Sequence, residues 1–563
     1  KWRLLLFITA ALLIFLLIIT RLYHLQIKGT DCFFFNEGSC KQNISDEASK
    51  RHIHNQIIKA QRGIIYDRNK DILAMSLPAK TLCINPNILF FHKDNNLDVQ
   101  KLATILNIPH HKLRKIINKN KDRKEYYLKR HVSKSIYLEL TKLSNPNIYF
   151  INENKRSYLG GEAFSNIIGF TDIDDNGQEG IELVNDNILK PIDGNKKIKK
   201  DNIGRSIETI EVTHKPSPGK NLILTLDKRI QIIAYDVLKK YIKKYQAESG
   251  SIVLVEAESG NILSMANYPS FDPEKRNTYK GTKIKNRAIY DLIEPGSTIK
   301  PFIIYAGLIN EVIDKSTIID TAPGVIRLDN KEIKDWKYLG KVSTGDIIKL
   351  SSNIGAAKVS KKLSKKQLIS NLNLFGFGQS LFINLPGSKS GSLPSPNSLS
   401  DSNQFSIGYG YGISVSLMHL VNAYTILANI GSQTQLKYIT NTYPDQSKQV
   451  LDGQISNIIL DMMSEVVHSS DGTGKKASVS GYTVYGKTGT VRKIKNGEYD
   501  KNSHNALFIG ILGDPKPKYV AAVIIREPQD REGSGGFHAA PVFGEFLQHT
   551  MRMLDDIRYA GTD

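Results

Sequence analysis

Ser297 and Lys300 are the residues of this chain best suited to covalent chemistry. They stand three positions apart in EPGSTIKPF, Glu294 to Phe302. A helix that begins after Pro295-Gly296 stacks both side chains on one face, and its free N–H groups bring positive potential to the serine oxygen. The pair then provides a nucleophile and its base. In the simpler interpretation, Ser297 only caps a helix and Lys300 is a solvated surface residue.

A serine-lysine centre also needs a proton relay and a group that holds an anionic substrate. Ser351-Ser352-Asn353 begins SSNIGAAKVSKKL, a pattern typical of a buried helix start. Lys487-Thr488-Gly489-Thr490 ends the alternating strand pattern YTVYGKTGTV. A strand edge presents Lys487, Thr488 and Thr490 to a cleft, and Gly489 leaves room for a substrate backbone. The three motifs together predict one nucleophilic site.

Each of these short motifs has a second copy elsewhere in the chain. The copies lie at Ser217–Lys220, Ser395–Asn397, Ser503–Asn505 and Lys389–Gly391. Pro218-Gly219 keeps the first copy out of a helical turn. The others lie in a Ser/Pro/Gly loop or follow a polar turn, where a side chain is not held rigidly. Context therefore favours Ser297, Ser351 and Lys487.

The elements that must position these residues follow from the apolar patterns. Gln61 to Pro86 predicts two short strands joined by a turn, and Asp98 to Leu143 predicts small surface helices. Next come a strand LILTL, a helix capped by Asp227, and a hairpin that turns at Ser259-Gly260-Asn261. Further strand pairs are expected around Tyr482 to Val491 and Ala506 to Ile525. The fold class is α/β (α+β), with an antiparallel sheet.

Leu4 to Thr20 form an uncharged apolar run of 17 residues between Arg3 and Arg21. This length is close to the roughly 20 residues that span a bilayer, and Trp2 and Tyr23 suit the interfaces. RLYHLQI follows instead of a small-residue cleavage site, so we expect an uncleaved anchor. The expected orientation places the N-terminus in the cytoplasm. Because the sequence begins without Met, further cytoplasmic residues are expected before Lys1.

Composition argues against several classes of function. The 563 residues suggest about three units and carry a net charge of +21, but the lysines are scattered, which disfavours nucleic-acid binding. The three cysteines have no metal-site spacing and lie far from the motifs, which argues against thiol chemistry. Cys32 and Cys40 could pair in an oxidising compartment. Cys83 is expected in a core.

The motifs STIK, SSN and KTGT resemble those of the penicillin-binding proteins. The surrounding segments NRAIYDLIEPGSTIKPF, LSSNIGAAKVS, SIGYGYGISVS and HNALFIG are similar too. RGIIYDRNKDILA and GQEGIE resemble the non-catalytic domain of class B enzymes. The likeness runs from about Gln61 to Phe543, and SSN followed by Ile-Gly-Ala-Ala-Lys is similar to the septal, cell-division type (FtsI family).

This resemblance implies a domain plan. It has a transmembrane anchor at 1–22, a linker at 23–57, a non-catalytic pedestal domain of the dimerisation type at 58–217, and a transpeptidase domain at 218–563. The last domain is expected to have an antiparallel sheet flanked by helices. The implied location is the bacterial cytoplasmic (inner) membrane, with the catalytic domain on the periplasmic side.

The resemblance also implies a mechanism. Ser297 attacks the penultimate D-Ala of a peptidoglycan stem peptide ending in D-Ala-D-Ala, and the amine of a second stem peptide resolves the acyl-enzyme. Lys300 is the implied base, Ser351 the proton relay, and Asn353 holds Lys300 and the substrate amide. Lys487, Thr488 and Thr490 would bind the terminal carboxylate, and the N–H groups of Ser297 and Thr490 would form the oxyanion hole. No metal or organic cofactor is implied.

Partners and alternatives follow from the same resemblance. The implied partners are a membrane-embedded glycan polymerase of the SEDS type and other division proteins, with β-lactams as covalent inhibitors. An elongation-type transpeptidase, a carboxypeptidase, and a penicillin-sensing receptor or silent division scaffold remain alternatives. The anchor and the non-catalytic domain argue against a β-lactamase. The absence of an acidic motif before Pro216 argues against a bifunctional synthase.

Overall fold

The computed structural model describes residues 1–23, 53–91, 96–143, 145–200, 206–275, 281–328, 331–381, 383–440, 447–495, 498–513, 516–529 and 533–560. The chain forms two compact units. Unit 1 comprises Lys1–Arg62, Ser76–Lys155 and Lys190–Lys220, and unit 2 comprises Gly63–Met75, Arg156–Leu189 and Asn221–Asp563. The predicted domain boundaries at 57/58 and 217/218 stay a prediction. Cys32 and Cys40 lie outside the described residues.

The N-terminal helix α1(Trp2–Tyr23) covers the predicted anchor. Its 22 residues extend about 33 Å at 1.5 Å per residue, enough to cross a hydrocarbon core. None of its side chains is buried in protein. The Thr9 and Thr20 hydroxyls donate to carbonyl oxygens one turn back, so these polar groups are satisfied without water. The helix therefore fits a single-pass membrane anchor.

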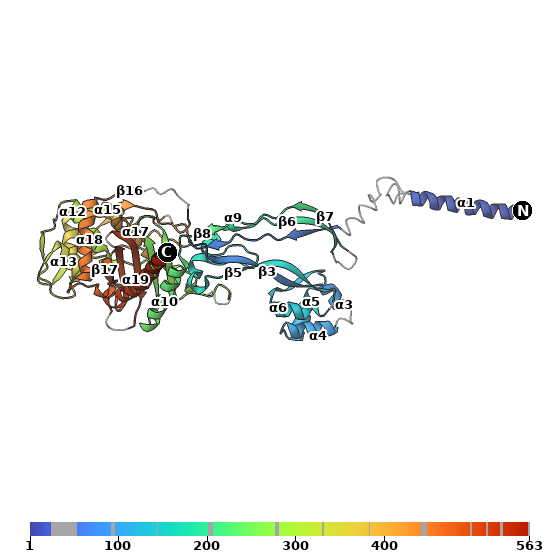
Figure 1. Cartoon of the computed structure of the whole chain (residues 1–563), viewed down its shortest axis with the longest axis horizontal. Helices are drawn as coiled ribbons and strands as arrows, with labels where there is room; N and C mark the ends of the chain where they lie inside the picture. The colour runs from blue at the N-terminus through green and yellow to red at the C-terminus, as the bar shows by residue number, and fades with distance from the viewer. Residues whose placement is uncertain are drawn as a thin grey trace. The chain divides into compact units, whose positions relative to one another are not determined.

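Unit 1 combines β-strands with short helices (Figure 1). Its strands are β1(Ile53–Ile58), β4(Tyr126–Val132), β6(Gly194–Lys200) and β7(Ser206–His214), with most of β3(Ile72–Ile84) and β5(Ile148–Tyr158). Its helices are α3(Pro86–Phe91), α4(Asn96–Ile105), α5(His110–Lys119) and α6(Lys134–Thr141). The helices pack around apolar residues that include Leu82, Leu102 and Leu113. Cys83 is fully buried, as predicted.

One strand of unit 1 departs from the sequence-based expectation. The segment Asp98 to Leu143 forms the predicted helices α4, α5 and α6, but β4 lies between α5 and α6. β4 pairs antiparallel with β3. The expectation of helices alone was wrong here because the pairing partner of β4 lies some forty residues earlier in the chain.

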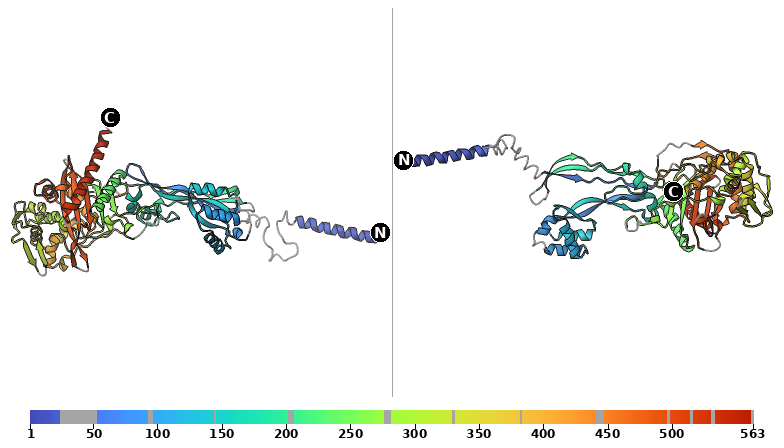
Figure 2. Two further views of the ribbon diagram at one scale, coloured as in Figure 1. Left: turned by 90° about the horizontal axis from the view of Figure 1, so that it is seen from below. Right: turned by 180° about the vertical axis from the view of Figure 1, so that it is seen from behind.

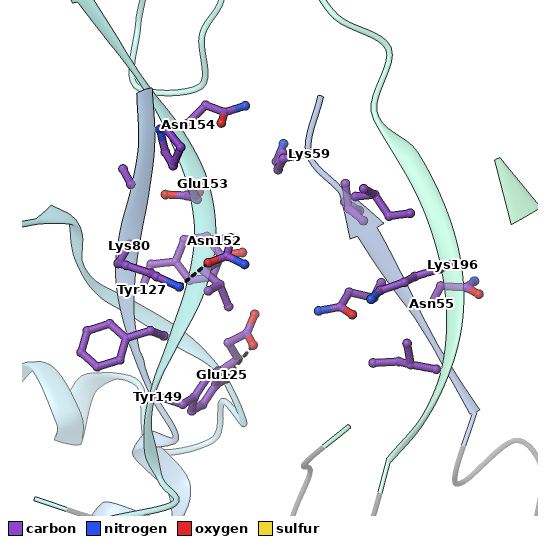
Figure 3. A pocket seen from close by; sticks show the side chains of 18 residues that line it. Asn55, Lys59, Lys80, Glu125, Tyr127, Tyr149, Asn152, Glu153, Asn154 and Lys196 are labelled. Atoms are coloured by element: carbon purple, nitrogen blue, oxygen red, sulfur yellow. Dashed lines mark hydrogen bonds between the residues drawn. The ribbon is translucent and has the colours of Figure 1, made fainter. Parts of the chain in front are cut away.

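A polar pocket of about 960 Å³ lies within unit 1 (Figure 3). Lys59, just after β1, and Lys196 of β6 lie on one side of it, opposite Lys80 and Asn152 on β3 and β5. Lys80 donates to the Asn152 side-chain oxygen at 2.6 Å. The polar groups that line this pocket are therefore partly satisfied by each other.

Unit 2 is built on a five-stranded antiparallel sheet with the order β10-β9-β19-β18-β17. The strands are β9(Ser249–Glu256), β10(Ile262–Tyr268), β17(Thr483–Lys495), β18(Glu498–Gly513) and β19(Pro517–Arg526). The predicted hairpin and the predicted C-terminal strand pairs are confirmed. β17 lies at the edge of the sheet, and the strand continues past the KTGT motif to Lys495.

Shorter strands and helices complete unit 2. The strands are β2(Ile65–Tyr66), β8(Leu222–Ile223), β11(Ile318–Asp320), β12(Val325–Leu328), β13(Lys331–Lys334), β14(Lys341–Ser343), β15(Ser432–Gln433) and β16(Lys448–Gln449). The helices are α7(Ser165–Ile168), α8(Gly180–Val184), α9(Asp186–Leu189), α10(Lys228–Lys244), α11(Arg287–Tyr290), α12(Lys300–Ile309), α13(Thr344–Lys349), α14(Asn353–Lys362), α15(Lys365–Leu374), α16(Asp401–Gly408), α17(Leu417–Ala428), α18(Gly453–His468) and α19(Gly535–Ala560). Asp227 caps α10 as predicted, accepting from the Arg229 N–H. LILTL is a strand only at β8.

Alternation along the sheet strands gives the sheet two buried faces. Ile252, Leu254 and Val523 pack with α10 and α19, whereas Val253, Val255 and Ile524 pack with the helices that include α12 and α17. Successive residues of a strand point to opposite faces, so a continuous apolar strand can serve two cores. Figures 1 and 2 show the sheet between these helical layers.

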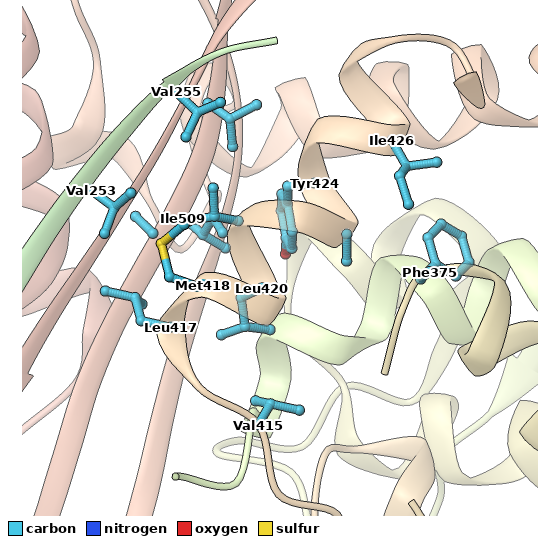
Figure 4. Close-up of a cluster of buried hydrophobic side chains, with 14 of the residues drawn as sticks. Val253, Val255, Phe375, Val415, Leu417, Met418, Leu420, Tyr424, Ile426 and Ile509 are labelled. Atoms are coloured by element: carbon cyan, nitrogen blue, oxygen red, sulfur yellow. The ribbon is translucent and has the colours of Figure 1, made fainter. Parts of the chain in front are cut away.

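Helix α17 packs in the core that contains Val253 and Val255 (Figure 4). All twelve of its residues are buried. The Tyr424 hydroxyl donates to the carbonyl oxygen of Thr298 at 2.9 Å. Because a buried hydroxyl is expensive to leave unpaired, this bond holds the Ser297 segment against the core.

Candidate active site

Ser297 lies in a short 3-10 helix, η7(Gly296–Ile299), that leads into α12. The α-helix begins only at Lys300, three residues later than the Pro-Gly pair suggests. In a 3-10 helix, side chains at i and i+3 eclipse each other, so Ser297 and Lys300 still share one face. Ser297 is half-buried, and no described residue hydrogen-bonds its hydroxyl. The serine is thus positioned and chemically free.

A glycine contact holds the backbone next to Ser297. The Gly296 N–H donates to the Gly410 carbonyl oxygen at 3.0 Å. Gly410 has a φ of +94°, and a Cβ there would lie 2.0 Å from the Gly296 carbonyl oxygen. Only glycine allows this approach. The SIGYGYG segment therefore supports the turn that presents the serine.

Lys300 is fully buried and reaches the SSN motif. Its ammonium nitrogen Nζ lies 2.6 Å from the Ser351 carbonyl oxygen, 2.8 Å from Asn353 Oδ1 and 3.2 Å from Ser351 Oγ. The fold thereby joins two of the predicted motifs. Ser351 has a φ of +60° and immediately precedes Ser352, the N-cap of α14.

Lys487 contacts the same serine. Its Nζ lies 2.9 Å from Ser351 Oγ and 3.1 Å from the Thr488 carbonyl oxygen. Lys487 is also fully buried. The Ser351 hydroxyl therefore lies between two lysines that come from different motifs.

Burial changes the acidity of both lysines. Burial, and next the neighbouring Lys487 ammonium group, lowers the pKa of Lys300 well below its usual range, while the Asp335 carboxylate opposes this shift. Burial alone lowers the pKa of Lys487 to about 7. We therefore assign the neutral amine to Lys300, which has two causes favouring the neutral form.

Asp335 organises the SSN motif, although sequence reasoning missed it. Its carboxylate accepts from Ser352 Oγ at 2.9 Å, from the Ile354 N–H at 3.1 Å and from the Asn353 N–H. A carboxylate at a helix N-terminus accepts hydrogen bonds from the free N–H groups. Its negative charge also interacts favourably with the positive end of the helix dipole. Asp335 directly follows β13 in a segment without a motif, so no sequence signal marked it.

Along β17, Thr488 and Thr490 project from one face, and Lys487 and Gly489 project from the other. The Thr490 side chain is exposed, and its oxygen accepts from the Gly535 N–H at 3.0 Å. Thr488 is buried and donates to Thr473 Oγ1 at 3.2 Å. A Cβ at Gly489 would lie 2.9 Å from the Thr298 methyl group. Gly489 therefore makes room for η7, and the expectation that it also leaves room for a substrate backbone stays a prediction.

The second copies of the motifs do not join this site. Lys389 and Ser395 lie in a loop, and Ser217 lies outside any helix, as expected. Ser503 lies inside β18, so the expectation of a residue just after a turn was wrong there. The geometry brings together Ser297, Lys300, Ser351, Asn353 and Lys487, with the Thr488 to Thr490 strand beside them.

Comparison with known families supports this site. Residues 250–548 match the penicillin binding protein transpeptidase domain, and residues 57–224 match the penicillin-binding protein dimerisation domain. The chain is a class B penicillin-binding protein.

Relatives of this class B penicillin-binding protein match nearly its whole length. The peptidoglycan D,D-transpeptidase FtsI of Buchnera aphidicola subsp. Schizaphis graminum (strain Sg) is 33% identical over 559 residues, 98% of this chain and 95% of the relative. FtsI of Escherichia coli (strain K12) is 31% identical over 560 residues, 99% of this chain and 92% of the relative. Penicillin binding protein 3 of Mycobacterium tuberculosis, complexed with aztreonam, shares the fold at 24% identity with a TM-score of 0.69, covering 89% of this chain and 97% of that chain.

Proposed function

We propose that this protein is a peptidoglycan D,D-transpeptidase that cross-links stem peptides through an acyl-enzyme on Ser297. The observation that carries the proposal is the position of the Ser351 hydroxyl, 3.2 Å from Lys300 Nζ and 2.9 Å from Lys487 Nζ. A base and a second lysine within hydrogen-bond reach of one relay hydroxyl, with the nucleophile three residues before the base, suit two-step acyl transfer. The domain match supports the same reaction class.

Lys300 is the base in this proposal. A neutral amine has two N–H groups and one lone pair. The Ser351 carbonyl oxygen and Asn353 Oδ1, at 2.6 and 2.8 Å, account for both N–H groups. The lone pair is then left for the proton of Ser297, which stands on the same helical face. Asn353 fixes the orientation of the amine and, on the substrate side, holds the peptide amide.

Ser351 relays the proton to the leaving amine. It accepts a hydrogen bond from Lys487 at 2.9 Å and can donate its own proton onward. The departing D-Ala nitrogen must gain a proton, which passes from Lys300 through Ser351. Lys487 keeps its own proton and, through its hydrogen bond to Ser351 Oγ, keeps the relay oriented.

The β17 edge receives the substrate carboxylate. The Thr490 oxygen accepts from Gly535, so its O–H group stays available to donate. The Thr488 hydroxyl is already bonded to Thr473, so it must rotate to reach the substrate. An arriving carboxylate favours the charged form of Lys487, whose free pKa is about 7. The N–H groups of Ser297 and Thr490 complete the proposed oxyanion hole.

The cellular assignment rests on the relatives and on α1. The FtsI relatives favour septal cell-wall synthesis over elongation. We place the N-terminus in the cytoplasm and unit 2 on the extracytoplasmic side of the inner membrane, because Lys1 and Arg3 precede the apolar run. The proposed partners are a membrane-embedded SEDS-type polymerase and other division proteins, and β-lactams are the proposed covalent inhibitors.

Covalent labelling tests the chemistry. Full-length protein in detergent is incubated with a fluorescent penicillin and separated under denaturing conditions. The wild type is expected to carry the label and Ser297→Ala to lose it entirely. Ser217→Ala, which removes the serine of the other SxxK sequence, is the matched control and is expected to label normally. Labelling of Ser297→Ala would place the nucleophile elsewhere.

Depletion in the cell tests the septal assignment separately. Cells that lose a septal transpeptidase continue to elongate and form filaments. Cells that lose an elongation enzyme become round. Filaments restored to normal length by the wild-type gene but not by Ser297→Ala are the expected result. Round cells would assign the protein to elongation without affecting the proposed chemistry.

A further inference from the structure

A second cavity of about 570 Å³ lies in unit 2 next to the segment that precedes Ser297. Glu294, three residues before the serine, lines it from one side, and Val491, directly after the KTGT motif, lines it from the other. A Cβ built on Gly296 would lie 2.6 Å from a Val491 methyl group, so the nucleophile's turn and this part of β17 are in contact. The cavity therefore borders the site of acyl transfer.

The register of the sheet explains why Arg526 lines this cavity. Val491 pairs with Asn505 on β18, and Asn505 pairs with Arg526 on β19. Residues paired directly across an antiparallel sheet project from the same face. Lys487 lies four residues before Val491, hence on that face too, about 13 Å away along the strand. Arg526 thus belongs to the face that carries the catalytic lysine.

Arg526 meets a second arginine in the cavity wall. Arg287 of α11 and Arg526 are both more than nine-tenths buried, with exposures of 6% and 7%. They share one carboxylate, Asp291, at 3.5 Å from Arg287 and 3.4 Å from Arg526. Arg526 faces that carboxylate through Nε and donates from Nη1 to Ser251 Oγ at 3.3 Å, whereas Arg287 reaches it through Nη1. One carboxylate therefore leaves this buried pair with excess positive charge.

The remaining charges of the cavity do not neutralise the pair. Its lining has five cationic side chains and three carboxylates. Glu294 already accepts from the Gly412 N–H at 2.8 Å and the Tyr499 hydroxyl at 3.1 Å. Lys389 lies over the Tyr290 ring at 4.3 Å and faces the cavity from an exposed loop. Burial and the Arg287 charge lower the pKa of Arg526 to about 10, although the Asp291 carboxylate opposes this shift. The charged form of Arg526 is therefore less favourable here than in water.

We propose that this cavity binds a carboxylate of the acceptor stem peptide, with Arg526 and Arg287 as its ligands. The inference rests on the proposed transpeptidase function. An acceptor stem ends in a D-Ala carboxylate and must present its side-chain amine to the acyl carbonyl on Ser297. A guanidinium group binds a carboxylate through two parallel hydrogen bonds, and two guanidinium groups that share one carboxylate line this cavity.

The bound acceptor completes the reaction without another reagent. The acceptor nitrogen forms a bond to the acyl carbon, and the bond from that carbon to Ser297 Oγ breaks. The proton lost by the amine returns to Ser297 through Lys300. Holding the carboxylate next to the serine raises the effective concentration of the amine over that of water. The cavity would therefore favour cross-linking over hydrolysis.

Acceptor kinetics test this proposal. The enzyme receives a thioester donor and a synthetic stem pentapeptide whose side chain bears the acceptor amine. The pentapeptide is used with a free C-terminal carboxylate and as its C-terminal amide. We expect the amide to have a KM at least tenfold higher with the wild type. With Arg526→Gln, the two acceptors should have equal, high KM values. Equal KM values with the wild type, or an unchanged penalty for the amide in Arg526→Gln, would overturn the proposal.

Control variants keep the result interpretable. Arg526→Lys retains the charge and should recover part of the preference for the carboxylate. Lys389→Gln, on an exposed loop, should weaken the preference about threefold, and it serves if Arg526→Gln does not fold. Lys366→Gln, an exposed lysine of α15 far from the cavity lining, should match the wild type. Penicillin labelling of Ser297 should persist in every variant, so failure of this proposal is distinct from failure of the proposed function.

Discussion

The ammonium nitrogen of Lys487 lies 2.9 Å from the hydroxyl oxygen of Ser351, although 136 residues separate them in the chain. Lys300 Nζ lies 3.2 Å from the same oxygen. Two buried lysines next to one hydroxyl cannot both keep their charge without mutual repulsion. The site is therefore prepared to hold one neutral and one charged amine.

The first prediction concerns pH. Penicillin acylation requires neutral Lys300 and charged Lys487. The pKa of Lys487 is about 7, so its charge is lost as the pH rises above that value. We expect the second-order acylation rate to fall between pH 7 and pH 9. At saturating penicillin, the bound carboxylate stabilises the charge, and the decline should move to higher pH.

Stopped-flow measurement of acylation across this range checks the prediction. A rate that stays constant from pH 7 to pH 9 would mean that the Lys487 charge is not required. Thermal melting at each pH controls for loss of folded protein.

The second prediction concerns Asp335. Asp335→Asn keeps the shape of the side chain but removes the charge that accepts from Ser352 Oγ and the Ile354 N–H. We expect the start of α14 to loosen, with a loss of about 1 kcal/mol of stability and about tenfold slower acylation. Asp461→Asn, on the exposed face of α18, is the matched control. Acylation at the wild-type rate in Asp335→Asn would show that Ser351 and Asn353 are positioned without it.

The third prediction concerns the glycine contact behind Ser297. Gly410→Ala places a Cβ 2.0 Å from the Gly296 carbonyl oxygen and should displace the nucleophile, slowing penicillin acylation at least a hundredfold. Gly412→Ala is a close control. Gly412 also has a positive φ, +82°, but its Cβ would meet no atom within 4 Å. If both variants are slowed equally, backbone strain rather than the contact with Gly296 governs the loop, and an unslowed Gly410→Ala would contradict the prediction.

The fourth prediction concerns stability. Arg156 Nε donates to Glu182 Oε1 at 2.7 Å, with side-chain exposures of 2% and 0%. Glu182→Gln removes the carboxylate charge that faces this buried guanidinium and should destabilise unit 2 by about 3 kcal/mol. Urea denaturation monitored by far-UV circular dichroism measures the change in the free energy of unfolding. Glu258→Gln, at an exposed turn, should unfold like the wild type. A wild-type midpoint for Glu182→Gln would contradict the prediction.

Local pattern was sufficient for much of the fold. Alternating apolar residues predicted the hairpin of β9 and β10 and the strands β17 to β19, and Asp227 marked the start of α10. These features depend on neighbours within a few residues. β4 was missed because its stability comes from pairing with β3, a contact that no local pattern encodes. The strand predicted over LILTL was too long, because only Leu222 and Ile223 belong to a strand there.

The sequence by itself determined the identity and class of the site. The spacing of Ser297 and Lys300, with the SSN and KTGT motifs, was enough to predict the family and the residues to examine, because side-chain chemistry and short-range spacing are local properties. The tertiary structure decided which copies of each motif meet, which lysine loses its charge, and that Asp335 and Gly410 support the site. Those outcomes depend on burial and on contacts between distant segments, since desolvation and through-space distances exist only once the chain has folded.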